Sequence, residues 1–198
     1  VDDEILDFYN YTDGNGDSQL WYSAGVRQGG TFSIPPSVNR ITDDRDGDGI
    51  VNGSDHDHWE TGTTGLPAGD AWSMEVCSGE MHIAIRWSGS FGGGGGVGRY
   101  DFATGFWDFN EWTINNGLGD DDVVALACDD QEVIYIGYEG NGEGISRYDH
   151  ANDLWLSALD NGDGISESAV WYDGMDWLDG VLVAGHYSAG FSTIDASG

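Results

Sequence analysis

The sequence predicts an all-β fold built from repeated meanders of short antiparallel strands. Short β-branched and aromatic runs alternate with turns rich in Gly and Asp, and similar segments recur at spacings near 50 residues. No stretch shows the periodicity of an amphipathic helix. The 198-residue chain is long enough to bury the core of such a fold.

Residues 123–149 form the clearest repeat unit. The small apolar run 123–128 suits a strand buried on both faces, and the β-branched and aromatic run 133–138 predicts the next strand. A glycine-rich hairpin then leads to a third strand at 145–148. A fourth strand carrying Trp is predicted at 154–156, and its counterpart in the preceding copy at 106–109.

Four copies of this unit are predicted. When residues 123–149 are aligned with the segment 51 residues earlier, Cys128 falls on Cys77. When they are aligned with the segment 48 residues later, Ile136 falls on Ala184. A weaker copy opens the chain at residues 20–34. Four antiparallel strands in roughly 50 residues, repeated, are typical of β-propeller blades. We therefore predict one propeller segment over residues 1–198, with blade 1 at about 5–41, an insertion at 42–58, blade 2 at about 59–113, blade 3 at about 114–157 and an incomplete blade 4 at about 158–198.

Three stretches make the pattern more specific: GVGRYDFATGFW, NNGLGDDDVVALAC and YIGYEGNGEGISRYDHANDLW. They resemble the two-component regulator propeller repeat, over most of residues 60–195 and faintly over 5–34. The resemblance implies a propeller from an extracytoplasmic sensor region, with a glycan as one class of ligand. Blades of that family are assembled in sixes to eights, so the resemblance also implies that further blades come from a longer chain or from other subunits.

Cys77 and Cys128 occupy equivalent positions in neighbouring blades. Small residues at such positions are usually buried, so two free buried thiols are predicted. The alternative is a disulfide between the blades, which we disfavour because equivalent sites in adjacent blades are often too far apart for bridging geometry.

The insertion contains the pattern of a twelve-residue calcium loop that begins at Asp44. Hard oxygen ligands at positions 1, 3, 5, 7, 9 and 12, with Gly at position 6, are what Ca²⁺ requires. The predicted ligands are Asp44, Asp46, Asp48, the carbonyl of Ile50, Asn52 and Asp55. The pattern resembles the loops of dockerins and thrombospondin type 3 repeats, and it predicts a structural Ca²⁺ site. The alternative is an acidic loop that is simply solvated.

The five histidines carry weaker signals. His56 and His58 follow the acidic loop, and we expect an exposed polar segment there, with a transition-metal site as the alternative. His82, His150 and His186 lie on or beside predicted strands, where structural histidines are more common than catalytic ones.

The charge balance limits the classes of partner. Six Arg, no Lys and thirty-six acidic residues give a net charge of −30, which opposes binding to nucleic acids and to anionic lipid surfaces. No apolar run is long enough to span a membrane, so no membrane insertion is expected. We predict an exported protein at an extracellular or cell-surface location, with the periplasm as an alternative.

No nucleophile motif or phosphate-binding loop is recognisable, so no enzymatic activity is predicted. The first hypothesis is a calcium-binding module with a surface-binding or structural role, such as a filament, sheath or adhesin that associates with itself. The second is a glycan-sensing receptor region, and the third is a polysaccharide lyase or hydrolase. Candidates for stacking on a sugar are Trp87, Phe91, Tyr138 and Tyr187, although packing between blades is the favoured role for these rings.

Overall fold

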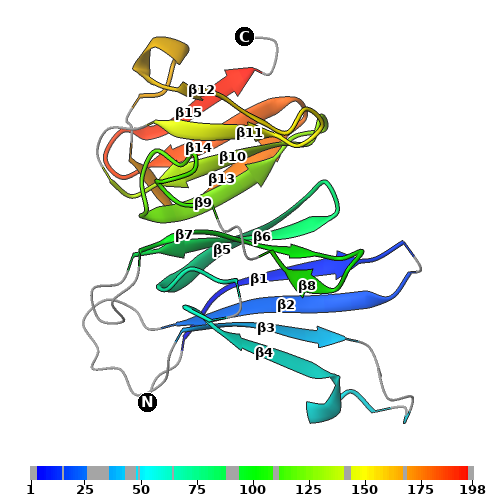
Figure 1. Ribbon diagram of the computed structural model, residues 1–198. Coiled ribbons are helices and arrows are strands. Elements are labelled where there is room, and N and C mark those ends of the chain that lie inside the picture. The colour runs from blue at the N-terminus through cyan, green and yellow to red at the C-terminus, as the bar shows by residue number, and fades with distance from the viewer. Residues whose placement is uncertain are drawn as a thin grey trace.

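The chain folds into four consecutive antiparallel sheets, in each of which the strands pair in sequence order (Figure 1). The computed structural model describes residues 4–14, 16–25, 36–42, 48, 50–63, 65–87, 94–108, 112–140, 144–166 and 169–195. The prediction of an all-β fold is confirmed, since the helical elements in these ranges are two short 3-10 turns, η1 (Gly53–Asp55) and η2 (Asn161–Asp163). Among the described residues, no helix is both long and apolar enough to cross a bilayer.

Each sheet corresponds to one predicted blade. Blade 1 contains β1 (Glu4–Thr12), β2 (Ser18–Gly25), β3 (Ser37–Thr42) and β4 (His56–Glu60). Blade 2 contains β5 (Asp70–Cys77), β6 (Glu80–Arg86), β7 (Gly96–Asp101) and β8 (Phe106–Trp107). Blade 3 contains β9 (Val123–Cys128), β10 (Val133–Tyr138), β11 (Ile145–Asp149) and β12 (Leu154–Leu159). Blade 4 contains three strands, β13 (Val170–Leu178), β14 (Val181–His186) and β15 (Gly190–Asp195), in line with the predicted incomplete last blade.

The sheets pack face to face in sequence order, with the first strand of each sheet beside the first strand of the next. In Figure 1 blade 1 lies at the bottom, blade 2 in the middle, and blades 3 and 4 at the top. Strands β1, β5, β9 and β13 therefore form the inner row of the assembly. This is the arrangement of successive propeller blades.

The end of blade 1 differs from the predicted boundary. Strand β4 pairs antiparallel with β3, so that Val38 lies opposite Trp59 and Arg40 opposite Asp57. Blade 1 therefore continues to Glu60, past the predicted limit at residue 41, and the acidic loop connects its third and fourth strands. The indole of Trp59 explains the extension, because it packs on the core between blades 1 and 2.

The hydrophobic core is divided into three clusters, each between two neighbouring sheets. The cluster between blades 1 and 2 includes Trp21, Val38, Met81, Ile83 and Tyr100. The cluster between blades 2 and 3 includes Ala84, Trp112, Leu126, Ile134 and Ile136. The cluster between blades 3 and 4 includes Ala125, Tyr135, Val170, Leu182 and Ala184. Strand β9 contributes to the two latter clusters, which confirms that the run 123–128 is buried on both faces.

In the described part of the chain, Arg40, Arg86 and Arg99 lie over aromatic rings. The guanidinium carbon of Arg40 is 5.3 Å from the ring centre of Trp21 and 5.5 Å from that of Trp59. Arg40 also forms an ion pair of 2.6 Å with Asp57. Arg retains its charge in such surroundings and stacks well on rings, which Lys does less well.

The prediction of free thiols is wrong. Cys77 at the end of β5 and Cys128 at the end of β9 form a disulfide with a Cα–Cα distance of 5.6 Å. The inner strands of blades 2 and 3 run close together at this end, so equivalent positions come within bridging distance. The bond links neighbouring blades across a sequence separation of 51 residues.

Replacement of both cysteines, C77A/C128A, is expected to lower the free energy of unfolding by about 2–4 kcal/mol, because the disulfide restricts the unfolded chain. Urea unfolding followed by Trp fluorescence measures the change. Dithiothreitol should destabilise the wild type by a similar amount and leave the variant unchanged. Equal stability of the oxidised wild type and the variant would contradict the prediction.

Candidate functional site

Four of the six predicted calcium ligands lie in the described part of the chain, namely Asp48, Ile50, Asn52 and Asp55, whereas Asp44 and Asp46 lie outside it. The Asp48 carboxylate accepts a hydrogen bond of 2.7 Å from the backbone N–H of Ile50. The Asn52 amide donates to the Ile50 carbonyl at 3.0 Å. The Asn52 N–H donates to the Asp55 carboxylate at 2.9 Å, and Asp55 is fully buried. These hydrogen bonds fold residues 48–55 into a compact loop, in which the Asn52 side-chain oxygen accepts from Ser54 and caps η1.

A second site candidate lies at the end of the sheets where β5, β9 and β13 begin and β6, β10 and β14 end. Four aromatic side chains gather there, and we call them the aromatic cluster: Trp72, Trp171, Tyr172 and Tyr187. Trp72 of blade 2 stacks on Tyr172 of blade 4 at 4.4 Å between ring centres. Trp171 lies 5.1 Å from Tyr187, and these two rings are 46% and 67% exposed.

A bulge in β13 produces this exposure. Between the pairs Val170–His186 and Met175–Ala184, β13 advances five positions while β14 advances two. The extra residues displace Trp171 and Tyr172 from the regular ladder, and Asp173 takes a left-handed backbone conformation with φ of 48°. Such bulges redirect side chains and occur often beside functional sites.

Charged groups from blades 2 and 3 hold the inner side of the aromatic cluster. The hydroxyl of Tyr172 donates to the carboxylate of Glu139, which also forms an ion pair with Arg86. The Arg86 guanidinium lies over the Tyr172 ring at 5.5 Å. Burial, together with Glu139, raises the pKa of Tyr172 to about 12, so its hydroxyl stays protonated as a donor. These contacts fix the Tyr172 ring in one orientation.

Acidic groups surround the ion pair. The carboxylates of Asp120, Asp121 and Asp122 lie within 4.8 Å of one another just before β9. Burial raises the pKa of Asp122, although Arg86 opposes the rise. Burial also raises the pKa of Asp70 to about 6, again against the effect of Arg86. A ligand at this end of the sheets therefore meets aromatic rings beside a strongly acidic rim.

Further along the inner strands, buried acids connect blade 1 to blade 2. Asp7 of β1 accepts a hydrogen bond of 2.8 Å from the backbone N–H of Met74 in β5. Tyr9 donates to Glu75 at 3.2 Å. Burial raises the pKa of Asp7 to about 7, and the negative charge of Asp173 adds to the rise. Burial likewise raises the pKa of Glu75 to about 7.

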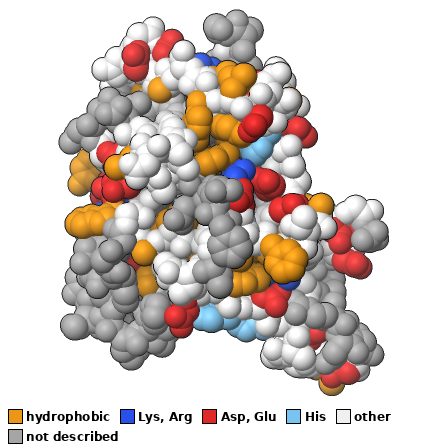
Figure 2. Space-filling model, in the orientation of Figure 1, with side chains coloured by type: hydrophobic (Ala, Val, Ile, Leu, Met, Phe, Trp, Pro, Cys, Tyr) orange, Lys and Arg blue, Asp and Glu red, His pale blue; other side chains and the backbone are white. Residues whose placement is uncertain are grey.

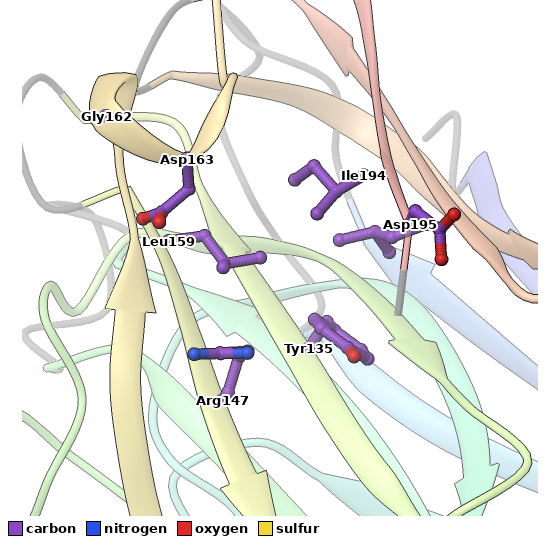
Figure 3. A pocket seen from close by; sticks show the side chains of 8 residues that line it. Tyr135, Arg147, Leu159, Gly162, Asp163, Ile194 and Asp195 are labelled. Carbon is purple, nitrogen blue, oxygen red and sulfur yellow. The ribbon is translucent and has the colours of Figure 1, made fainter. Parts of the chain in front are cut away.

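A cavity of about 300 Å³ opens between blades 3 and 4 (Figure 3). It is lined by Tyr135, Arg147, Leu159, Gly162, Asp163, Leu182, Ile194 and Asp195. Its polar groups are already engaged, since Arg147 donates to the Ser157 carbonyl at 2.7 Å and Tyr135 donates to Asp129 at 3.1 Å. The Asp163 carboxylate caps the turn η2. The polar groups at this cavity are thus held by contacts within the protein.

The structure distinguishes the aromatic candidates that the sequence suggested. Trp87 and Tyr187 are exposed, at 49% and 67%. Tyr138 is only 1% exposed, packs in the core between blades 2 and 3 and donates to Ser146, which agrees with the packing role favoured for this ring. Phe91 lies outside the described residues.

Sequence reasoning missed Trp171, Tyr172 and the pair Arg86–Glu139. One signal was present: the start of β13 carries two consecutive aromatic residues where the equivalent strand β9 carries small apolar ones. The bulge that exposes them depends on pairing with β14, which the repeat pattern does not encode. Their clustering with blade 2 depends on how blades 2 and 4 meet.

Comparison with known proteins agrees with the fold. No family model matches the sequence, and no curated protein matches it. The extracellular domain of the hybrid two-component system BT3049 from B. thetaiotaomicron matches with a TM-score of 0.63 and 13% identity, over 98% of this chain and 24% of that one. The corresponding domain of BT4673 matches with a TM-score of 0.60 and 16% identity, over 99% and 24%.

A third match is PorZ, a surface component of the type-IX secretion system of Porphyromonas gingivalis. Its TM-score is 0.59 with 14% identity, over 96% of this chain and 26% of that one. The chain thus spans about a quarter of each of these solved chains. At such identities the likeness concerns the fold, and this fold is the one that the propeller-repeat resemblance implied.

The raised pKa of Asp7 makes stability depend on pH. A carboxyl whose pKa is higher in the folded state than in the unfolded chain contributes its full stabilisation below pH 4 and loses it as the pH rises through about 7. The free energy of unfolding should therefore fall between about pH 4 and pH 7, and D7N should reduce this slope. Urea titrations at four pH values measure it.

The matched control is D179N, in the exposed turn between β13 and β14, which removes the same charge. A slope that changes equally in both variants would assign the effect to net charge, against our assignment to Asp7.

Proposed function

We propose that the chain is a non-enzymatic binding module of an exported protein and that the aromatic cluster contacts a carbohydrate ligand. The observation that carries this proposal is the bulge in β13, which exposes Trp171 beside Tyr187 while Tyr172 is held from behind by Trp72 and Glu139. Rigid aromatic rings at a surface, with polar groups close by, are typical of sites that bind small polar ligands.

The chemistry of the site favours a neutral glycan. Aromatic rings pack on the apolar faces of sugar rings, and Arg86, Glu139 and the nearby aspartates offer donors and acceptors for hydroxyl groups. A sulfated or uronic polymer would meet a chain of net charge −30, with Asp and Glu side chains spread over the face shown in Figure 2, and be repelled. Neutral hexose polymers are therefore the first ligands to test.

Two observations support an extracellular or cell-surface location. The disulfide between Cys77 and Cys128 is of a kind that persists in oxidising compartments. The solved structures that share the fold are described as extracellular domains and as a bacterial surface component.

The substitution W171A is expected to weaken binding of a neutral oligosaccharide roughly tenfold, which corresponds to about 1.4 kcal/mol. A glycan array identifies the ligand, and isothermal titration calorimetry measures the dissociation constant. F106A is the matched control, since Phe106 is an exposed aromatic residue of β8 in the outermost strand of blade 2.

Equal weakening by F106A and W171A would contradict a role for the aromatic cluster. If no glycan binds and light scattering shows concentration-dependent association, the assembly hypothesis gains support instead. That hypothesis has its own structural basis, because no described strand pairs with the outer edge of β15. Free strand edges can add strands from other subunits.

We also propose that the loop from Asp44 to Asp55 binds Ca²⁺ and that the ion stabilises blade 1. Support comes from the ligand pattern of the sequence, from the hydrogen bonds that link Asp48, Ile50, Asn52 and Asp55 in one compact loop, and from the position of this loop between β3 and β4. Burial of the Asp55 carboxylate is more favourable when a cation offsets its charge. The role would be structural, with no part in a reaction.

Calcium at about 100 times its dissociation constant should stabilise the protein by about 2.7 kcal/mol, which is a rise in melting temperature of roughly 5–10 °C. Differential scanning calorimetry of chelator-treated protein, with and without added Ca²⁺, measures this rise. The rise should disappear in D48N and persist in D43N, which alters an acid outside the ligand pattern. A rise of the same size in D48N would overturn the site.

A further inference from the structure

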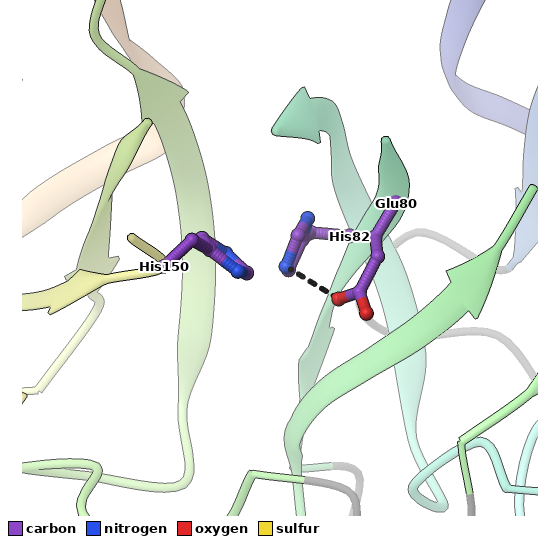
Figure 4. Close-up of side chains that lie close together, drawn as sticks. All are labelled: Glu80, His82 and His150. Atoms are coloured by element: carbon purple, nitrogen blue, oxygen red, sulfur yellow. Dashed lines mark ion pairs between the residues drawn. The ribbon is translucent and has the colours of Figure 1, made fainter. Parts of the chain in front are cut away.

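Two histidines and a glutamate meet at the interface between blades 2 and 3 (Figure 4). Glu80 and His82 lie on the same face of β6, because they are two residues apart on one strand. His150 follows the last residue of β11 and donates its backbone N–H to the Glu132 carbonyl at 3.2 Å. The three side chains offer one ligand atom each, and these atoms lie within 4.8 Å of one another.

Three of the four ring nitrogens of these histidines are buried and make no hydrogen bond of ordinary geometry with the described part of the chain. His82 is completely buried, and the backbone groups of Glu75 and Glu80 interact with its ring only weakly. Its Nε2 lies 3.6 Å from a carboxylate oxygen of Glu80, a separation too long for a hydrogen bond. The Nε2 of His150 is also buried without a partner. Buried polar atoms in native proteins are almost always satisfied, so this cluster of unsatisfied nitrogens calls for a ligand.

The environment of both rings disfavours their charged form. Burial lowers the pKa of His82, and the neighbouring His150 and Arg99 lower it further. Burial and then Arg99 lower the pKa of His150 as well. Neutral imidazole has a free lone pair, which is the state in which histidine is a ligand.

We propose that Glu80, His82 and His150 bind a divalent transition-metal ion, Zn²⁺ being the best fit. Two imidazoles and one carboxylate form a ligand set that Zn²⁺ uses in proteins, whereas Ca²⁺ takes oxygen ligands. Ligands of tetrahedral Zn²⁺ are about 3.4 Å apart, given bond lengths near 2.1 Å. The 3.6 Å between His82 and Glu80 is close to that value, and a small side-chain movement brings in His150.

The surroundings suit an ion that solvent reaches from one side. Trp112 lies beside both imidazoles, at 5.4 Å from His82 and 5.8 Å from His150. The Tyr148 ring approaches His150 edge-on at 5.0 Å. His150 and Glu80 are partly exposed, so an ion enters at these two residues and has His82 at the inner side.

Arg99 is the competing cation at this site. Its Nη1 lies 3.4 Å from the Glu80 oxygen that faces His82, and its Nη2 pairs with Asp108. A metal ion on Glu80 displaces only the first of these contacts, because Asp108 still balances the guanidinium. Arg99 also rests on the Trp112 ring at 4.7 Å, which holds it in place when Glu80 turns to the metal.

A bound ion links blade 2 to blade 3, since Glu80 and His82 belong to β6 and His150 directly follows β11. Glu80 pairs directly with Cys77 across the β5–β6 turn. The metal site therefore lies at the same end of the interface as the disulfide. Both cross-links would act on the same pair of blades.

Zinc titration of the untagged full chain tests the proposal. The protein is stripped with a chelator and titrated with Zn²⁺ against a chromophoric competitor, with millimolar Ca²⁺ present to occupy carboxylate sites. We expect one equivalent of Zn²⁺ per chain and a higher melting temperature. Co²⁺ bound at this site should give the visible absorption bands of a four-coordinate ion, and added Zn²⁺ should abolish these bands by displacing Co²⁺.

Four variants decide which residues bind the metal. H150Q and E80Q should each weaken Zn²⁺ binding more than about tenfold and remove the Co²⁺ bands. Loss of a metal ligand lowers the affinity more than loss of a residue that only hydrogen-bonds to a ligand. The double control H56Q/H58Q removes the exposed histidines of β4 and should keep wild-type affinity. C77A/C128A should retain the site, which separates metal binding from the disulfide.

Both ligand variants replace partly exposed side chains, and their melting temperatures without metal establish that they fold. Wild-type affinity in either H150Q or E80Q would overturn the proposal. Loss of Zn²⁺ in H56Q/H58Q alone would place the metal on blade 1, against our assignment. Failure of the wild type to bind Zn²⁺ would also overturn it.

Discussion

The structure depends on the packing of each sheet against the next. None of the described sheets encloses a core of its own, since the three hydrophobic clusters lie between blades 1 and 2, blades 2 and 3, and blades 3 and 4. Stability in such an array is the sum of the blades and their contacts with nearest neighbours. A side chain that separates two blades by even a fraction of an ångström therefore weakens both of them, because dense packing transmits strain.

The same constraint explains where the polar chemistry occurs. The inner strands run side by side, so a side chain on one strand meets partners from the next two blades: Ser73 of β5 donates to Asp173 of β13 and accepts from the Leu126 N–H of β9. The aromatic cluster and the Glu80–His82–His150 set likewise draw on more than one blade. In this architecture the candidate sites lie at the interfaces between blades, where the fold brings together residues that are distant in sequence.

Much of the fold could be predicted from the sequence, because the features of one blade are local. Apolar runs such as 123–128 and turns rich in Gly and Asp define strands within about 50 residues of each other. Relations between blades could not be predicted in this way. The pairing of Cys77 with Cys128, the bulge at Trp171 and the meeting of His82 with His150 all depend on distances across an interface. The loop at Asp44–Asp55 was recognisable because its pattern is contiguous, although its position between β3 and β4 was not.

The disulfide has a mechanical consequence for a chain held at its two ends. Tension that arrives along β5 passes from Cys77 directly to Cys128 and continues into the turn that leads to β10, since the bond is the shorter covalent path. Strands β6, β7, β8 and β9 lie between the two cysteines in the sequence, so they belong to a closed ring that carries no load while the bond is intact. Pulling would extend only the chain outside this ring, and reduction of one bond would add the slack of a sequence separation of 51 residues to the length of the chain.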